Sequence, residues 1–386
     1  MSRRWWCRRP IYTLAALAAA ALLATGAYRG VIADPQPPDP VAEAPDPFLK
    51  TPAAGCTWEV PVLVISYLPT HDGVNVAEDL TGYRMSLADL RKRIMAISVR
   101  TKFILEEGSR FHAYKDPAAK PAIGYRVVDM ITVFEPIPGD LKHGDNNGHY
   151  PPDYHKVLER FDIAKYVEQR GVKEVWLWMQ HYGDRFPVES NMASPLTGDI
   201  SNSWRISDDM PVLSKTYITY CYNFTRDARC AVENHMHQLE AQLDFISQRQ
   251  TGTADLFRKQ FVGIPVLGRC GNTHCPPNSA KDYDVANPTA VMSDIEDWTP
   301  DDTGHRTAVS RDTWLNKTYS WPDGKNRFDE WDGSYWFIYW QQNHPGRGNR
   351  IRHPKGWMTN WWALVGDWDG SVRRGLGLYG AQPDAG

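Results

Sequence analysis

The segment Tyr217-Ile-Thr-Tyr-Cys-Tyr222 leads almost directly into a helix-like segment from about Thr225 to Gln248, and this pair of elements decides the fold class. The first segment is rich in aromatic and β-branched residues, which favour a strand. In the second, apolar residues recur at helical spacing, for example Val232, Met236 and Leu239. A strand that passes into a helix is the building unit of an α/β fold.

The same alternation is found earlier in the chain. Strands are predicted at Val60–Leu68, Tyr125–Phe134 and Val172–Met179, and helices at Ser86–Glu107 and Tyr154–Arg170. This order predicts an α/β three-layer sandwich with a mixed, largely parallel sheet, followed by a long irregular Trp-rich C-terminal part. In such sheets clefts form beyond the carboxyl ends of the strands, so we expect the site in the loops that follow them.

The N-terminus predicts export from the cytoplasm. Arginines among the first nine residues precede a mostly apolar run from Ile11 to Ala24, and small residues follow up to Ala27. This is the order of a secretory signal peptide, and the run is shorter than the ~20 residues that a membrane span needs. Trp5 and Trp6 leave open an uncleaved anchor at the membrane interface. The expected location is secreted or extracytoplasmic, with no membrane contact once the signal is cleaved.

We divide the chain into a signal peptide at 1–27, a Pro-rich linker at 28–54 and a single secreted α/β domain at 55–386. The prolines between Asp34 and Pro47 fix φ and remove backbone donors, which favours an extended spacer. The folded part is therefore expected to begin near Cys56. A single large domain fits the remaining length.

The composition excludes some classes of partner. With 42% hydrophobic residues and a net charge of −3, the body is globular and has no general attraction for nucleic acid. The 16 tryptophans admit two interpretations, because indole rings stack on sugars and are also ordinary core residues. We expect most of them in the core. The oligomeric state is not predicted.

Five cysteines lie in the exported body, where pairing is the default. Cys270 and Cys275 are spaced to close a small loop, and Cys221 and Cys230 to tie a strand end to a helix start. Cys56 is then left over. Both disulfides are expectations that depend on Cα atoms lying within about 7 Å.

Glu233, His237 and Glu240 are spaced along one helix face, which predicts a metal site. Three residues of one helix spread over ~10 Å of its length, so another segment must contribute, and His274 and Asp294 are the candidates. The cofactor would be Zn²⁺ or another divalent cation. The competing interpretation is a hydrogen-bonded polar flank without a metal.

Other polar and aromatic residues fall in the predicted cleft loops. Glu189 and His274 are candidates for the catalytic base. Further side chains are assigned to substrate binding because they border the same loops: Trp178, Asn191, Asn278 and Trp298.

Several segments resemble a family of uncharacterised secreted bacterial proteins. They are Pro61–Tyr67, Glu174–Trp178, Glu189-Ser-Asn-Met192, residues 220–244, His274-Cys-Pro-Pro-Asn278 and Asp294-Ile-Glu-Asp-Trp298, and the similarity covers most of 55–380. Members often carry His at the position of Glu233, which gives a His-x-x-x-His-x-x-Glu helix similar to the zinc helix of metallopeptidases. Here the helix is degenerate, Glu-x-x-x-His-x-x-Glu, and Asn234 stands where a catalytic glutamate would be. The family implies no activity beyond this likeness.

The expected function is that of a secreted hydrolase-like protein, metal-dependent and peptidase-like, acting on an extracellular polymer. A second hypothesis is a glycan-acting or glycan-binding protein with stacking tryptophans and a carboxylate pair such as Glu189 with Glu296 or Asp297. A third is a non-catalytic secreted binding protein.

Overall fold

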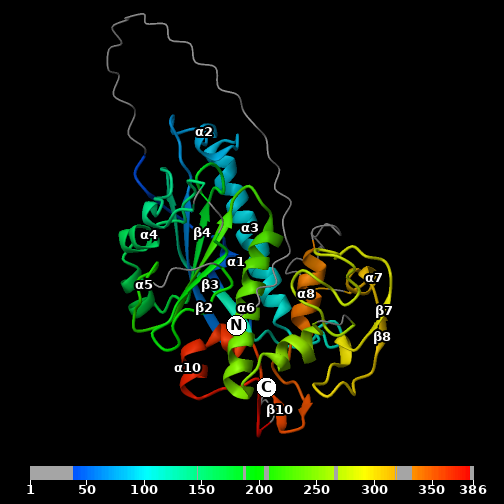
Figure 1. The fold of residues 1–386 in the computed structure, drawn as a ribbon. Coiled ribbons are helices and arrows are strands. Elements are labelled where there is room, and N and C mark those ends of the chain that lie inside the picture. The colour runs from blue at the N-terminus through cyan, green and yellow to red at the C-terminus, as the bar shows by residue number, and fades with distance from the viewer. Residues whose placement is uncertain are drawn as a thin grey trace, which may run out of the picture. The chain divides into compact units, whose positions relative to one another are not determined.

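The structure is a computed structural model that describes residues 38–145, 147–185, 188–203, 208–264, 268–317, 319 and 333–382. The predicted signal peptide and the first part of the predicted linker lie outside these residues. None of the described helices has both the length and the apolar character needed to span a bilayer. The described residues belong to one compact unit, drawn as a ribbon in Figure 1.

A six-stranded mixed sheet forms the centre of this unit, in the order β1-β3-β2-β4-β6-β5. The four inner strands are parallel, and each edge strand is antiparallel to its neighbour. The strands are β1 (Val41–Glu43), β2 (Trp58–Tyr67), β3 (Ile123–Val133), β4 (Glu174–Met179), β5 (Ser190–Ala193) and β6 (Tyr217–Asn223). The predicted mixed, largely parallel sheet is therefore confirmed, and its four inner strands are the four predicted ones.

Helices cover both faces of the sheet, as Figure 1 shows. One face packs against α3 (Leu87–Gly108) and α6 (Ala228–Thr251), and the other against α4 (Tyr154–Arg160) and α5 (Ile163–Arg170). Alternate residues of the buried strands point to opposite faces, so each strand supplies both cores. In β2, for example, Val64 belongs to the α3/α6 core and Ile65 to the α4/α5 core.

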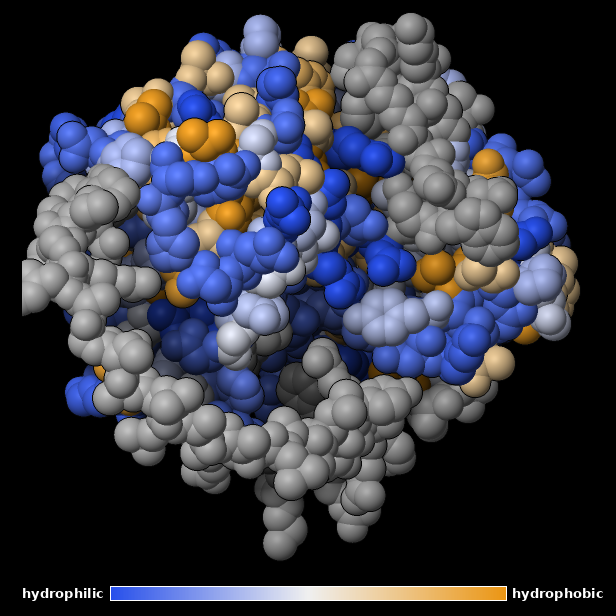
Figure 2. Space-filling model, turned by 90° about the horizontal axis from the view of Figure 1, so that it is seen from above, coloured by the Kyte–Doolittle hydropathy of each residue, from blue (hydrophilic) through white to orange (hydrophobic). Residues whose placement is uncertain are grey.

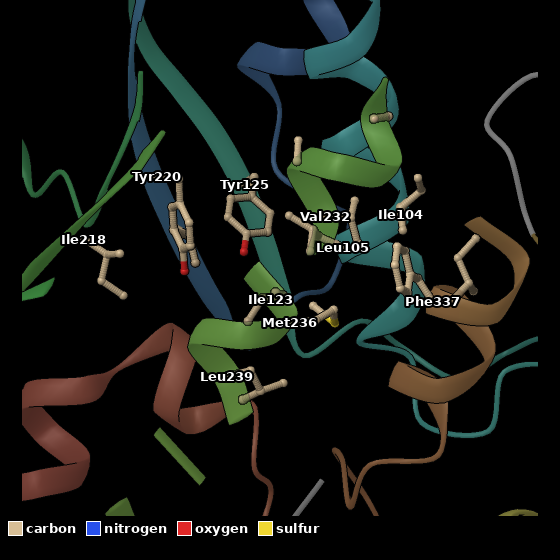
Figure 3. Close-up of a cluster of buried hydrophobic side chains, with 14 of the residues drawn as sticks. Ile104, Leu105, Ile123, Tyr125, Ile218, Tyr220, Val232, Met236, Leu239 and Phe337 are labelled. Atoms are coloured by element: carbon tan, nitrogen blue, oxygen red, sulfur yellow. The ribbon is translucent and has the colours of Figure 1, made fainter. Parts of the chain in front are cut away.

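The larger core joins the sheet to α3, α6 and a third helix, α8 (Ser334–Gln342) (Figure 3). Every residue of α8 is buried. It packs on α3 and α6. Figure 3 shows the residues that meet in this core: Tyr125, Ile218 and Tyr220 from the sheet, Ile104 and Leu105 from α3, Val232, Met236 and Leu239 from α6, and Phe337 from α8.

Short elements make up the remainder, and the C-terminal part is irregular as predicted. The helices are α1 (Pro47–Lys50), α2 (Glu78–Thr81), α7 (Arg311–Leu315), α9 (Ala363–Gly366) and α10 (Trp368–Arg373), with 3₁₀ turns at Leu141–His143 and Ile295–Asp297 and a π-helix at Leu256–Val262. The strands are β7 (Val291–Ser293), β8 (Thr307–Val309), β9 (Arg352–His353), β10 (Gly356–Met358) and β11 (Tyr379–Gly380).

The described part of the predicted linker, residues 38–54, is folded and corrects the expectation of an extended spacer. β1 pairs with β3, and Leu49 of α1 is fully buried. Asp46 caps α1 by accepting a hydrogen bond from the Phe48 amide at 2.8 Å, and Pro47 occupies the first helical position, where a missing N–H costs nothing. The Asp-Pro pair that suggested a spacer is therefore a helix start.

The helix predicted at Tyr154–Arg170 is broken into α4 and α5. Asp162 lies between them with φ +53°, in the left-handed region, and ends α4. Its side chain accepts a hydrogen bond from the Lys165 amide at 3.3 Å and so caps α5.

The predicted disulfides are wrong, because Cys221, Cys230 and Cys270 are free thiols, as is Cys56. Cys221 is in the α4/α5 core, where its Sγ contacts Met179, whereas Cys230 lies on α6 at the other face of the sheet. The sheet itself separates this pair. The Cys275 Sγ lies 3.9 Å from the Lys281 carbonyl oxygen.

Candidate metal centre

Glu233, His237 and His274 bring three potential metal ligands to one point. One ligand atom from each lies within 4.8 Å of the others. The Nε2 atom of His274 is 3.0 Å from Glu233 Oε1 and 2.8 Å from His237 Nε2, and His237 Nε2 is 3.8 Å from Glu233 Oε1. Their side chains are 12% (Glu233), 12% (His237) and 25% (His274) exposed, so the cluster borders solvent.

Two elements supply these residues. Glu233 and His237 are one turn apart on α6, whose first turn is capped by Asp227 directly after β6. His274 comes from the loop after the π-helix. A segment far from α6 in the sequence thus joins two residues of the helix.

Each imidazole has a carboxylate behind it. His237 Nδ1 is 3.1 Å from Glu240 Oε2, and His274 Nδ1 is 3.0 Å from Asp282 Oδ1. A carboxylate accepts, so the Nδ1 atom of each neutral ring carries the proton and the Nε2 atom presents a lone pair. This carboxylate–histidine pairing is the usual outer support of metal-binding histidines.

Two inward lone pairs and a carboxylate oxygen at one point require positive charge between them. Burial would lower the pKa of His237, but hydrogen bonds to Glu233 and Glu240 outweigh it and raise the pKa to about 10. Burial would likewise raise the pKa of Glu233, but hydrogen bonds from His237, His274 and Tyr283 hold it well below its usual value. The cluster therefore attracts a proton or a cation.

The loop that carries His274 is fastened to the core. Glu240 Oε1 accepts a hydrogen bond from the Thr273 amide at 3.0 Å. The indole N–H groups of Trp336 and Trp340, on α8, donate to the carbonyls of Thr273 and Gly271, both at 3.2 Å. The tryptophans of α8 thus act on the site by holding its loop in place.

Glu240 was predicted as a ligand and is instead a support. Its carboxylate lies between His237 Nδ1 and the Thr273 amide, because it is two turns along α6 from Glu233. Burial would raise its pKa, but the hydrogen bond with His237 outweighs it and lowers the pKa to about 2. Glu240 therefore remains an anion that fixes the orientation of His237.

His274, predicted as a catalytic base, has the geometry of a ligand, because both of its ring nitrogens are engaged. Glu189 lies close enough to interact electrostatically with His237 and Tyr283, and its carboxylate accepts a hydrogen bond from Asn202. Of the two predicted bases, Glu189 is not among the three potential ligands.

Tyr283 was missed by the sequence reasoning. Its hydroxyl donates to Glu233 Oε1, and its ring stacks on His274 with centroids 4.0 Å apart. Its φ of +57° is unusual for a non-glycine residue, and such backbone strain is common at functional sites. A tyrosine carries no ligand signal in a sequence, so no pattern of residues pointed to it.

The residues predicted for substrate binding have structural partners. Trp178 and Trp298 are 1% and 3% exposed, and their rings pack against Tyr222 and Phe261 in the core. Asn191 is 1% exposed and donates to Asp209 at 2.8 Å. Asn278 donates to two loop carbonyls, at 2.9 and 2.7 Å.

The remaining acidic candidates are also engaged elsewhere. Asp294, proposed as a ligand from the second segment, is fully buried in an ion pair with Arg269. Glu296 pairs with Lys317 at 2.7 Å and accepts from Tyr339, and Asp297 accepts from the His305 amide.

The carboxyl ends of the parallel strands lie at the end of the molecule seen in Figure 2. This face is hollowed, and hydrophilic residues are visible inside the hollow. Comparisons with protein-family models, with curated proteins and with solved structures found no match.

Proposed function

We propose that Glu233, His237 and His274 bind a divalent cation, Zn²⁺ first among them, and that the protein is an extracytoplasmic metal-dependent hydrolase. The observation that carries the proposal is the pair of imidazoles with their Nε2 atoms 2.8 Å apart and a carboxylate behind each. Without a cation or a shared proton, the two lone pairs would repel each other. Two nitrogens on one tetrahedral zinc are about 3.3 Å apart, so a shift of about 0.5 Å suffices to admit the ion.

Two histidines and one glutamate form a ligand set of the catalytic type. Catalytic zinc sites have three protein ligands and leave a fourth position for water, whereas structural sites are closed by four. A cation in that set lowers the pKa of bound water toward neutrality and so supplies hydroxide for hydrolysis. The same ligand types also serve non-haem iron, so the element has to be identified directly.

Glu189 is our candidate for the general base. In the zinc helix of metallopeptidases a glutamate beside the first ligand takes this role, but here Asn234 stands there. The Asn234 amide donates to the carbonyls of Glu189 and Cys221, at 3.2 and 2.9 Å, and therefore ties α6 to the loop before β5. That contact fixes the backbone of Glu189 relative to α6, and we propose that its carboxylate accepts the proton.

The most direct test of metal binding is element-specific metal analysis of protein purified without chelator. About one equivalent of a single divalent metal is expected in the wild type, and little in His237→Ala or His274→Ala. His305→Ala, which changes an exposed histidine, serves as the matched control. Equal and negligible metal in all four proteins, also after incubation with Zn²⁺, would rule the centre out.

Activity separates the proposal from its alternatives. Release of new amino termini from a protein substrate, abolished in Glu189→Gln at unchanged metal content, supports a metal-dependent hydrolase acting on an extracellular polymer. Release of reducing sugar would favour the glycan hypothesis, against which the burial of Trp178 and Trp298 already weighs. Full metal occupancy with no hydrolysis of either polymer would point to a binding protein.

A further inference from the structure

A cavity of about 380 Å³ lies at the amino ends of β4 and β6, beside α10. Its wall includes the first residues of both strands, Glu174 and Tyr217, whereas the helix of the metal centre begins after the carboxyl end of β6. The cavity is therefore a separate site. Its volume falls in the range of small-molecule pockets, roughly 300 to 1,000 Å³.

Lysine side chains on this wall are bonded to neutral groups. Lys173 Nζ donates to the carbonyl oxygens of Glu59, at 2.8 Å, and Gly366. Lys215 Nζ donates to the carbonyl oxygen of Glu168 at 2.9 Å. An ammonium group has three donors, so both lysines keep N–H groups and charge for a ligand.

The carboxylates of the wall are occupied by the protein. Asp369 accepts hydrogen bonds from the amide and the hydroxyl of Thr216, at 3.0 and 2.5 Å. Asp367 caps α10 and pairs with Arg374 at 2.9 Å. Burial raises the pKa of Glu174 to about 8, which favours its neutral form. Arg373 and Arg374 also line the wall, so its four cationic side chains outnumber the carboxylates of Asp367 and Asp369.

Other parts of the wall are apolar. Trp368 is 5% exposed and contributes an indole ring, and Val172, Ile218 and Leu364 are buried around it. Such a surface accommodates an aromatic or aliphatic body, while the lysines attract an anionic group. An apolar wall with a few charged groups is the usual composition of a small-molecule pocket.

We propose that this cavity binds a small organic anion, with its acidic group on Lys173 and Lys215 and its apolar body against Trp368. The proposal is independent of the metal centre, because no residue of the two sites is shared. Binding of such a ligand should therefore persist in His237→Ala.

The test uses two fluorescent probes of similar shape, the anionic anilinonaphthalene sulfonate and the neutral N-phenylnaphthylamine, titrated into the full-length protein. We expect saturable binding of the anion near one equivalent, and an increase in Kd of about tenfold in Lys173→Met, since a charge-assisted hydrogen bond is lost. Lys173→Arg should retain binding. Lys92→Met, which removes an 81% exposed lysine on α3, is the matched control.

Lys215→Met provides a second variant that is safe for folding, because Lys215 is exposed. A threefold or larger increase in the Kd of the anionic probe, with the Kd of the neutral probe unchanged, supports the site. The proposal is overturned if both probes bind equally to the wild type, or if Lys173→Met and Lys215→Met, folded by circular dichroism, bind the anion as the wild type does.

Discussion

His237 and His274 meet edge to face, with their Nε2 atoms 2.8 Å apart and their ring planes at 79°. Residues from two segments that are far apart in the sequence thus present their basic atoms to the same point. The carboxylates behind them, Glu240 and Asp282, fix which nitrogen faces inward. Such an arrangement stores electrostatic repulsion unless a cation or a proton relieves it, and the first two predictions follow from this relationship.

Removal of the metal should destabilise the wild type. A cation that binds only the folded state adds stability by mass action, ~4 kcal/mol when its free concentration is a thousandfold above Kd. We expect a chelator to lower the Tm of metal-loaded wild type by several degrees and to leave the Tm of His274→Ala unchanged. Differential scanning calorimetry measures both. An identical chelator effect on the two proteins would contradict the prediction.

Asp282→Asn should weaken metal binding without removing a ligand. The substitution replaces the carboxylate behind His274 Nδ1 with an amide of the same shape, and loss of such outer support costs about 10- to 100-fold in affinity. Competition with a chromogenic chelator gives the Kd. Asp255→Asn, which breaks an exposed ion pair with Lys259, should leave the Kd unchanged.

Trp336→Phe should loosen the loop that carries His274. The substitution leaves the Thr273 carbonyl without its indole donor, which costs roughly 1 to 3 kcal/mol of the free energy of unfolding, and it should also weaken metal binding. Trp362→Phe is the matched control, because Trp362 is equally buried but its Nε1 has no hydrogen-bond partner among the described residues. Urea denaturation and metal titration measure the two effects. Equal metal affinity in both variants would show that the indole donor does not act on the site.

Glu174 should make stability depend on pH. Burial raises its pKa from 4.5 to about 8 in the folded state, although Trp176 and Tyr125 donate hydrogen bonds to it. Between these values the folded protein holds a proton that the unfolded chain releases. Its contribution to stability is therefore complete below pH ~4.5 and is lost as the pH rises through ~8, by up to a few kcal/mol.

Glu174→Gln should remove this slope while keeping an acceptor for the Trp176 indole. Denaturation midpoints at several pH values between 5 and 9 would show a flatter profile than that of the wild type. A variant that loses stability with pH just as steeply would show that another group is responsible.

The strands were predictable because their apolar runs are short and fully buried, as in β4, where all six residues are buried. β1 and α1 were missed because a proline-rich composition was given more weight than the helix-start signal of Asp46-Pro47. The break at Asp162 depends on a left-handed backbone that a periodic pattern does not reveal.

At the site, helical spacing was sufficient to select Glu233 and His237. Because residues of one helix spread along its axis, a ligand from another segment, such as His274, could also be predicted. Spacing alone did not show that the Glu240 carboxylate would lie next to the Nδ1 atom of His237. Tyr283 depends on the conformation of an irregular loop, for which sequence periodicity carries no information.

β1 protects the edge of the central sheet from pairing with other molecules. It shields the outer margin of β3, an eleven-residue strand, with a short antiparallel segment paired at Val41, Ala42 and Glu43. A truncation that starts at residue 55 would uncover a row of unsatisfied amides and carbonyls on β3, which is a template for pairing between molecules. Such a shortened protein should aggregate, so the segment that contains β1 is needed to keep the protein soluble.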